Sequence, residues 1–148
     1  MAQQKAKKDA ARKNLQHATS KPSDVGYVTV NSRGRATGLQ PAGRAEIAES
    51  VLGTKARLAE ALGVSASQPT RWISGEERPS AVNERALVDL NYVLERAQLL
   101  WGSEQVVRDW LYGHNGHLGG ARPVDVIRLE GATPVIEALE AAWAGGYA

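Results

Sequence analysis

The sequence predicts an all-α protein, a multi-helix bundle with a helix-turn-helix and a small C-terminal helical domain, preceded by a segment with the pattern of a short β-hairpin. The first observation is that apolar residues recur at the three- and four-residue spacing of a helix face in most of the chain after residue 42. The second is that Gly, Pro, Ser and Thr stand between these runs, where they begin and end helices. The third is that 43% of the 148 residues are hydrophobic, which suffices for a buried core. These signals predict a basic arm (1–24), a hairpin and linker (25–42), a helix-turn-helix domain with a long connecting helix (43–101) and a C-terminal domain (102–148).

The N-terminal part of the chain is strongly basic. Residues 1–44 carry a net charge of +7, whereas the remaining 104 residues carry −5. We expect residues 1–24 to form a disordered or partly helical arm that either lies along phosphates or only aids solubility. Residues 25–37 have the β-branched residues and central turn of a hairpin. Two strands alone are marginal in water, so the hairpin should pack on the body or pair with a second subunit.

A helix begins the bundle at residues 43–52, after Gln40-Pro41. The following stretch then predicts two short helices joined by a tight turn. Thr54 is placed to cap the first of them, and Gly63 to end it in the left-handed conformation. Ser67 is the expected cap of the second, with Pro69 in its first turn. Only four residues separate the two helices, which is the connection of a helix-turn-helix.

The second of these helices is expected to turn Trp72 and Ile73 inward and its N-terminal polar edge outward. In a helix-turn-helix, that edge meets bases in the major groove, where Arg recognises guanine and Gln recognises adenine. The alternative is a two-helix corner that only packs. Residues 45–78 carry four basic and five acidic residues, so the unit alone should bind DNA weakly. The predicted DNA-contacting residues are Lys55, Ser65, Ser67, Gln68, Thr70 and Arg71.

The longest predicted helix covers residues 81–101 and spans ~32 Å. Its apolar stripe is broad, so we expect it to join the two domains and to contribute to a dimer. Gly102 ends it, and three further helical segments follow, separated by a glycine-rich turn at residues 113–120 and by Gly131. The residues expected to face the core of the C-terminal domain include Val106, Val107, Trp110 and Leu111, and then Val135, Ile136, Leu139 and Trp143.

The sequence predicts neither an enzyme nor a cofactor or metal site. The absence of cysteine excludes disulfides and thiolate ligands. His114 and His117 would make a poor metal site, because the next carboxylate in the sequence is Asp125. Gly53-Thr-Lys55 lacks the pattern of a phosphate loop. Because the chain has neither a membrane-length apolar run nor a secretory signal, we expect a soluble, cytoplasmic protein.

Two sets of motifs resemble known families. LAEALGVS, SQPTRW and SGEERPS follow the pattern of Xre-type, phage-repressor-like helix-turn-helix proteins. The second set is similar to the C-terminal domain of Xre/MbcA/ParS antitoxins and, together with the first set, extends the resemblance over residues 54–148. Its most characteristic members are Trp110-Leu111, Asn115, Leu118-Gly119-Gly120, Pro123, Asp125, Ile127, Gly131, Val135, Leu139 and Gly145.

The resemblance implies an antitoxin. Its C-terminal domain would bind and block a RES-domain toxin, an enzyme that destroys NAD, and its helix-turn-helix would bind a double-stranded operator and repress the operon. Asn115, Gly119, Gly120, Pro123 and Asp125 would have mainly structural roles. The toxin-contacting surface would be the last helix and tail, with Ile136, Leu139, Glu140, Trp143 and Tyr147.

Two alternatives stay open at this point. One is a stand-alone Xre-like regulator of prophage type, whose C-terminal domain serves for dimerisation. The other is an adaptor whose helix-turn-helix no longer binds DNA and only mediates assembly. A homodimer is expected for an antitoxin and for a stand-alone regulator, because two half-sites one helical turn apart require a two-fold protein.

Overall fold

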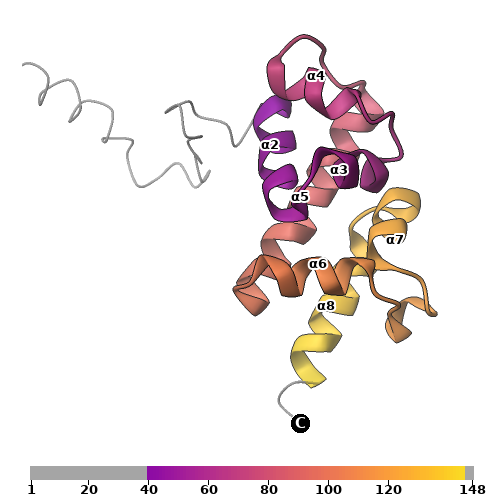
Figure 1. Cartoon of the computed structure of the whole chain (residues 1–148). Coiled ribbons are helices and arrows are strands. Elements are labelled where there is room, and N and C mark those ends of the chain that lie inside the picture. Colours follow the sequence, from indigo (N-terminus) through magenta and orange to yellow (C-terminus); the bar gives the residue numbers. More distant parts are fainter. Residues whose placement is uncertain (1–39, 146–148) are drawn as a thin grey trace, which may run out of the picture.

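The computed structural model describes residues 40–145, which form seven α-helices and one 3₁₀ turn and contain no strand (Figure 1). The all-α class is confirmed for this part of the chain. The predicted basic arm and hairpin, and Tyr147, lie outside the described residues. The elements are α2 (Pro41–Leu52), α3 (Lys55–Leu62), α4 (Gln68–Ser74), α5 (Ala81–Trp101), α6 (Glu104–Tyr112), η1 (Gly116–Leu118), α7 (Pro123–Glu130) and α8 (Thr133–Gly145).

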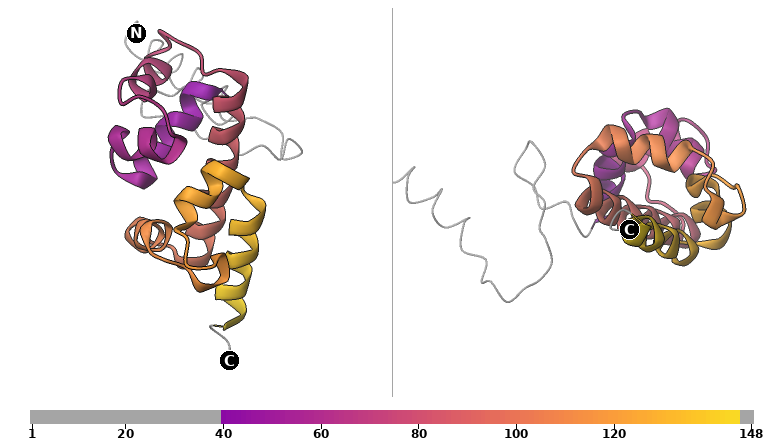
Figure 2. Two further views of the ribbon diagram at one scale, coloured as in Figure 1. Left: turned by 90° about the vertical axis from the view of Figure 1, so that its right-hand side faces the viewer. Right: turned by 90° about the horizontal axis from the view of Figure 1, so that it is seen from below.

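Helix α5 passes through both halves of the molecule. Helices α2, α3 and α4 lie around its N-terminal half, and α6, α7 and α8 lie around its C-terminal half (Figures 1 and 2). The predicted range of 81–101 is confirmed. The Ser80 hydroxyl accepts the Asn83 N–H at 3.3 Å to begin the helix, and Gly102 ends it at φ 66°. None of the helices within residues 40–145 is both long enough and apolar enough to cross a membrane.

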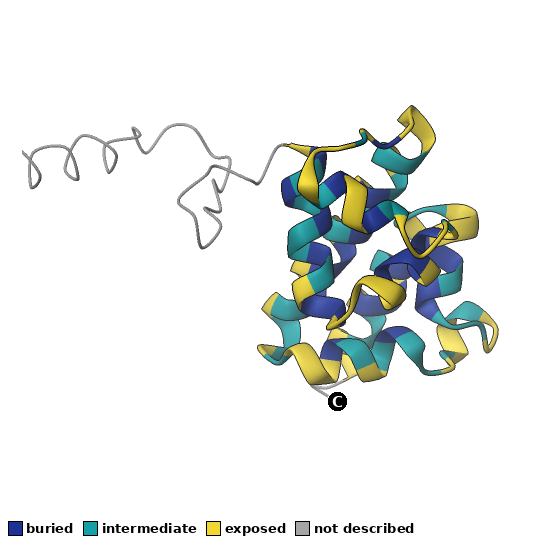
Figure 3. Ribbon diagram, turned by 45° about the horizontal axis from the view of Figure 1, so that its top comes forward, coloured by how far each residue is buried: buried dark blue, intermediate teal, exposed yellow. Residues whose placement is uncertain are grey.

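One hydrophobic core runs through both halves, with the buried faces of the helices turned toward one another (Figure 3). Trp72, only 1% exposed, anchors α4 in this core. Two predictions of core-facing residues were wrong, because Val106 is 42% exposed and Trp143 is 51% exposed. Trp110 is half-buried against the core and also packs against Trp101, with ring centroids 5.4 Å apart.

The short helices begin largely where local chemistry places them. The Thr54 hydroxyl accepts the Arg57 N–H at 3.2 Å, and Gly63 has φ 66°, so both predicted caps of α3 are confirmed. The predicted position of Ser67 at the N-cap of α4 is confirmed, but its side chain accepts no capping hydrogen bond. Its backbone is already near-helical, with φ −82° and ψ −21°, whereas a side-chain cap needs an extended residue. Helix α2 begins at Pro41, two residues before the predicted Gly43, because proline fits the first helical turn.

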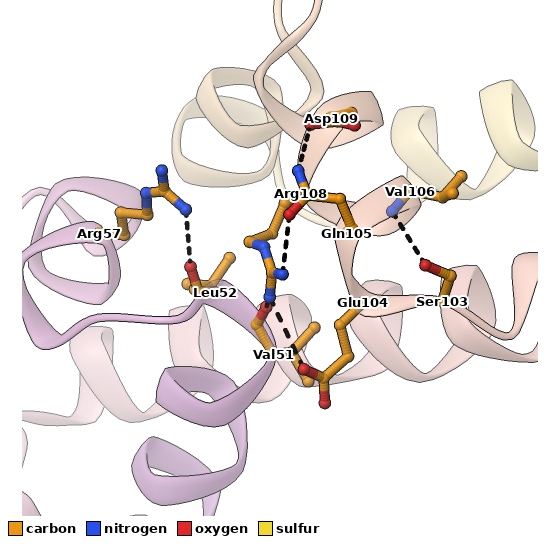
Figure 4. Close-up of polar contacts among 9 residues, drawn as sticks. All are labelled: Val51, Leu52, Arg57, Ser103, Glu104, Gln105, Val106, Arg108 and Asp109. Atoms are coloured by element: carbon orange, nitrogen blue, oxygen red, sulfur yellow. Dashed lines mark hydrogen bonds and ion pairs between the residues drawn. The ribbon is translucent and has the colours of Figure 1, made fainter.

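Two arginines from other helices donate hydrogen bonds to backbone carbonyls at the C-terminal end of α2 (Figure 4). Arg108 Nη1 of α6 donates to the Val51 carbonyl at 2.7 Å, and Arg57 Nη1 of α3 donates to the Leu52 carbonyl at 3.2 Å. The last carbonyls of a helix have no partner within that helix, and positive charge is favourable there. Arg108 thus ties the C-terminal half of the molecule to the first helix of the N-terminal half.

Replacing this arginine tests the connection. We expect Arg108→Ala to lower the free energy of unfolding by about 1–3 kcal/mol, because the part-buried Val51 carbonyl loses a charged donor. Urea denaturation followed by circular dichroism measures the change. Arg85→Ala, at an exposed position of α5, is the matched control and should change stability by less than about 0.5 kcal/mol. Equal losses in the two variants would contradict the role given to Arg108.

Candidate functional site

The first candidate surface is the outer edge of α4. Ser67, Thr70 and Arg71 are exposed on it, whereas Trp72 and Pro69 are buried beneath it. The side chain of Arg71 is 49% exposed. The fold therefore presents the predicted polar edge to solvent on a helix whose opposite face is fixed by a buried tryptophan.

The remaining predicted DNA-contacting residues differ in how available their side chains are. Gln68 is only partly exposed, and its Oε1 accepts the backbone N–H of Ser65 at 3.3 Å. Ser65 and Ser67 are exposed, and their hydroxyl oxygens are 3.4 Å apart. Lys55 is exposed at the first residue of α3. Gln68 thus stabilises the turn, which leaves Arg71 as the longest exposed side chain on this edge.

The second candidate surface is a groove of about 500 Å³ between α5 and α8. Leu99 is 73% exposed on the α5 wall, and Trp143 is 51% exposed on the α8 wall. Large apolar side chains that share one exposed depression mark interaction sites more often than isolated ones do. The groove is lined by Arg96, Leu99, Leu100, Ile136, Leu139, Glu140 and Trp143.

This groove brings together four of the five residues predicted to contact a toxin, namely Ile136, Leu139, Glu140 and Trp143. Leu139 is only 4% exposed, so it mainly belongs to the core beneath the groove. The residues predicted to contact a toxin did not include those of the α5 wall, Arg96, Leu99 and Leu100. The sequence did contain a signal for this wall, because Leu99 is a large apolar residue that lies outside the buried stripe of α5.

Charged groups stand on both walls of the groove. Arg96 Nη2 donates to the Tyr92 hydroxyl at 3.3 Å, and its guanidinium lies 5.5 Å from the centre of that ring. The hydrogen bond with Tyr92 raises the pKa of Arg96, and the negative charge of Glu140 adds to the effect. The α5 wall thus carries the positive charge of Arg96 and the α8 wall the negative charge of Glu140, and the rest of the lining is apolar.

The glycine-rich turn has a structural role in this fold. The Asn115 side chain accepts the His117 N–H at 2.9 Å, and the Asn115 carbonyl accepts the Gly120 N–H at 2.9 Å. Gly119 and Gly120 have φ 64° and 85°, which favour glycine. His114 Nδ1 is bonded to the Gly120 carbonyl at 2.7 Å. In residues 40–145, no three His, Asp or Glu side chains are grouped so as to hold a metal ion.

Asp125 belongs to an ion-pair network that joins the start of α7 to α3. It accepts from Arg122 Nε at 2.7 Å and from Nη2 at 3.1 Å, and Arg128 lies 3.6 Å away. Arg122 also pairs with Glu60 of α3 at 3.6 Å. The hydrogen bonds that Arg122 donates to Asp125 lower the pKa of Asp125 and raise the pKa of Arg122. This network could not be inferred from spacing, because its α3 member is distant in sequence.

Comparison with known proteins yields one domain match and one shared fold. Residues 96–145 match the family described as the antitoxin Xre/MbcA/ParS C-terminal toxin-binding domain. The fold is similar to that of a chain in the crystal structure of the M. tuberculosis MbcT–MbcA toxin–antitoxin complex. The TM-score is 0.61 at 22% identity, over 70% of this chain and 94% of that chain. No curated protein matches the sequence.

Neutralising Asp125 tests its role across pH. Because the folded-state pKa of Asp125 lies below the ordinary value of 3.8, its stabilising contribution is present above that value and is lost as pH falls through the lowered pKa. We therefore expect Asp125→Asn to melt at a lower temperature than the wild type near neutral pH, and the difference to shrink below about pH 4. Thermal unfolding followed by circular dichroism over this range measures both.

The control for this comparison is Asp109→Asn, because the Asp109 carboxylate accepts from the Gln105 amide at 2.8 Å instead of from an arginine. Its melting temperature should follow that of the wild type at each pH. A deficit in Asp125→Asn that stays constant from neutral to acidic pH would contradict the proposed charge pairing.

Proposed function

We propose that this chain is the antitoxin of a type II toxin–antitoxin pair, because residues 96–145 match the C-terminal domain of Xre/MbcA/ParS antitoxins that the sequence resembles. The observation that carries the proposal is the position of the groove. Its two walls, residues 96–100 and 136–143, lie at the two ends of the matched domain, which is described as toxin-binding. The toxin docks in this groove.

The chemistry of the groove suits a protein partner. Burying an exposed side chain such as Leu99 or Trp143 contributes about 1.5–3 kcal/mol, and a few such residues usually supply most of the binding energy. Arg96 and Glu140 on opposite walls favour one orientation of the partner and disfavour others. The sequence resemblance implies that this partner is a RES-domain toxin that degrades NAD.

The helix-turn-helix has a second role in this proposal, which is to bind the operator and repress the chain's own operon. Arg71 contacts guanine from the exposed edge of α4, while Ser67 and Thr70 contact phosphates or bases beside it. A homodimer places two copies of α4 on two half-sites. Val88 and Tyr92, 37% and 44% exposed on α5, are the apolar residues we assign to that dimer contact.

Two exposed leucines give a matched test of the toxin-binding surface. Leu99 in the groove is 73% exposed and Leu129 on α7 is 75% exposed. We expect Leu99→Glu to abolish copurification with the protein encoded by the adjacent gene, because a carboxylate would be buried against an apolar partner. Leu129→Glu should leave the complex intact.

Retention of the toxin by both variants would contradict docking in the groove. Loss of self-association in Leu99→Glu, for a chain that binds no product of the adjacent gene, would instead favour the stand-alone regulator, whose C-terminal domain serves for dimerisation. Growth of cells that co-express the toxin with each variant supplies an independent measurement of neutralisation.

Substitution at Arg71 tests DNA recognition. We expect Arg71→Ala to weaken binding to the DNA upstream of the gene by about 1–3 kcal/mol, because a bidentate contact with guanine is lost. Gln68→Ala should have a smaller effect, since the Gln68 side chain is engaged with Ser65. Fluorescence anisotropy at one fixed salt concentration measures both, with Arg85→Ala on α5 as control. Unchanged affinity in Arg71→Ala would remove α4 from the DNA interface.

A further inference from the structure

An ion pair restrains the side chain proposed to recognise DNA. Arg71 Nη1 lies 3.5 Å from Glu77 Oε2, and the two side chains are 49% and 40% exposed. The pair therefore stands at the surface, where both groups remain within reach of a bound duplex. The pair involves Nη1, and a guanidinium carries further N–H donors on its other nitrogens.

The backbone holds Glu77 in this position. Its N–H donates to the Arg71 carbonyl at 3.2 Å, and the Ser74 hydroxyl donates to the same carbonyl at 3.1 Å. Gly75, with φ 78°, turns the chain back at the end of α4, and the buried Pro79 fixes the far end of the segment. The folded turn after α4 thus places Glu77 beside Arg71.

We propose that Glu77 is a specificity-determining residue, which acts through Arg71 as a positioning residue. This inference rests on the proposed DNA-binding function. A guanidinium held from one side presents its remaining N–H groups in a defined direction, which suits two parallel bonds to O6 and N7 of guanine. An unrestrained arginine contacts phosphates of any sequence equally well.

Charge balance supports the same conclusion. Residues 45–78 carry four basic and five acidic residues, so this unit attracts phosphates weakly. The Glu77 carboxylate lies well within a Debye length of any phosphate that Arg71 can reach. It therefore lowers the affinity for arbitrary DNA while it orients the side chain that selects a base. Specificity rises because the non-specific competitor is weakened more than the oriented contact.

The test compares Glu77→Gln with the wild type on two duplexes of equal length, the DNA upstream of the gene and a scrambled version of it. Glutamine keeps the size of the side chain and removes its charge. We expect the affinity for scrambled DNA to rise by about two- to fivefold, the range of an exposed ion pair, and the preference for the upstream DNA to fall by a similar factor. Fluorescence anisotropy at fixed salt gives all four affinities.

Two further variants separate positioning from simple repulsion. Glu76→Gln removes the same charge one residue away, without a pair to Arg71, and should raise both affinities equally. In an Arg71→Ala background, Glu77→Gln should leave the preference unchanged, because the coupled partner is gone. An unaltered preference in Glu77→Gln, or an equal fall in the Arg71→Ala background, would overturn the inference. A wild-type chain that does not prefer its upstream DNA would overturn the proposed DNA-binding function itself.

Discussion

The rest of the structure depends on burial of one apolar stripe along α5. Isolated helices shorter than about 12–15 residues are marginal in water, and α3, α4, α6 and α7 have between seven and nine residues. These helices form because tertiary packing stabilises them. Helix α5, with 21 residues, is long enough to supply a common surface for both halves, and Leu87, Leu90 and Leu94 on it are at most 1% exposed. A short helix such as α4 can therefore present a candidate surface, because packing in the core fixes its position.

The groove follows from where the core ends. Val135, Ala138 and Leu139 bury the first part of α8, and the helix then continues to Gly145 beyond the core. Leu99, near the end of α5, is left uncovered on the facing wall. Each uncovered apolar side chain costs free energy in water, so an arrangement that leaves several in one depression is stabilised most by a partner that covers them. The groove is thus the part of the helix pair that lies at the edge of the core and stays open to solvent.

Local patterns in the sequence predicted several helices well, since the range of α5 and the caps Thr54 and Gly63 depend on neighbouring residues. The exposed polar edge of α4 followed from the same periodicity. The contacts between halves could not be predicted, because the Arg108 to Val51 bond joins residues 57 positions apart. Helical spacing also placed Trp143 in the core, although it cannot tell a face buried by the chain itself from one left for a partner.

That ambiguity has a physical origin which applies to both candidate surfaces. A side chain that will be buried by a partner obeys the same spacing as one buried by its own chain, so only the three-dimensional extent of the core separates them. On α8 the core ends before Trp143, and on α4 a single buried tryptophan fixes one face and leaves Arg71 outside. Arg71 in turn meets Glu77 only because the turn after α4 folds back. Position relative to the core, more than residue type, therefore distinguishes the residues that stabilise this fold from those that face solvent.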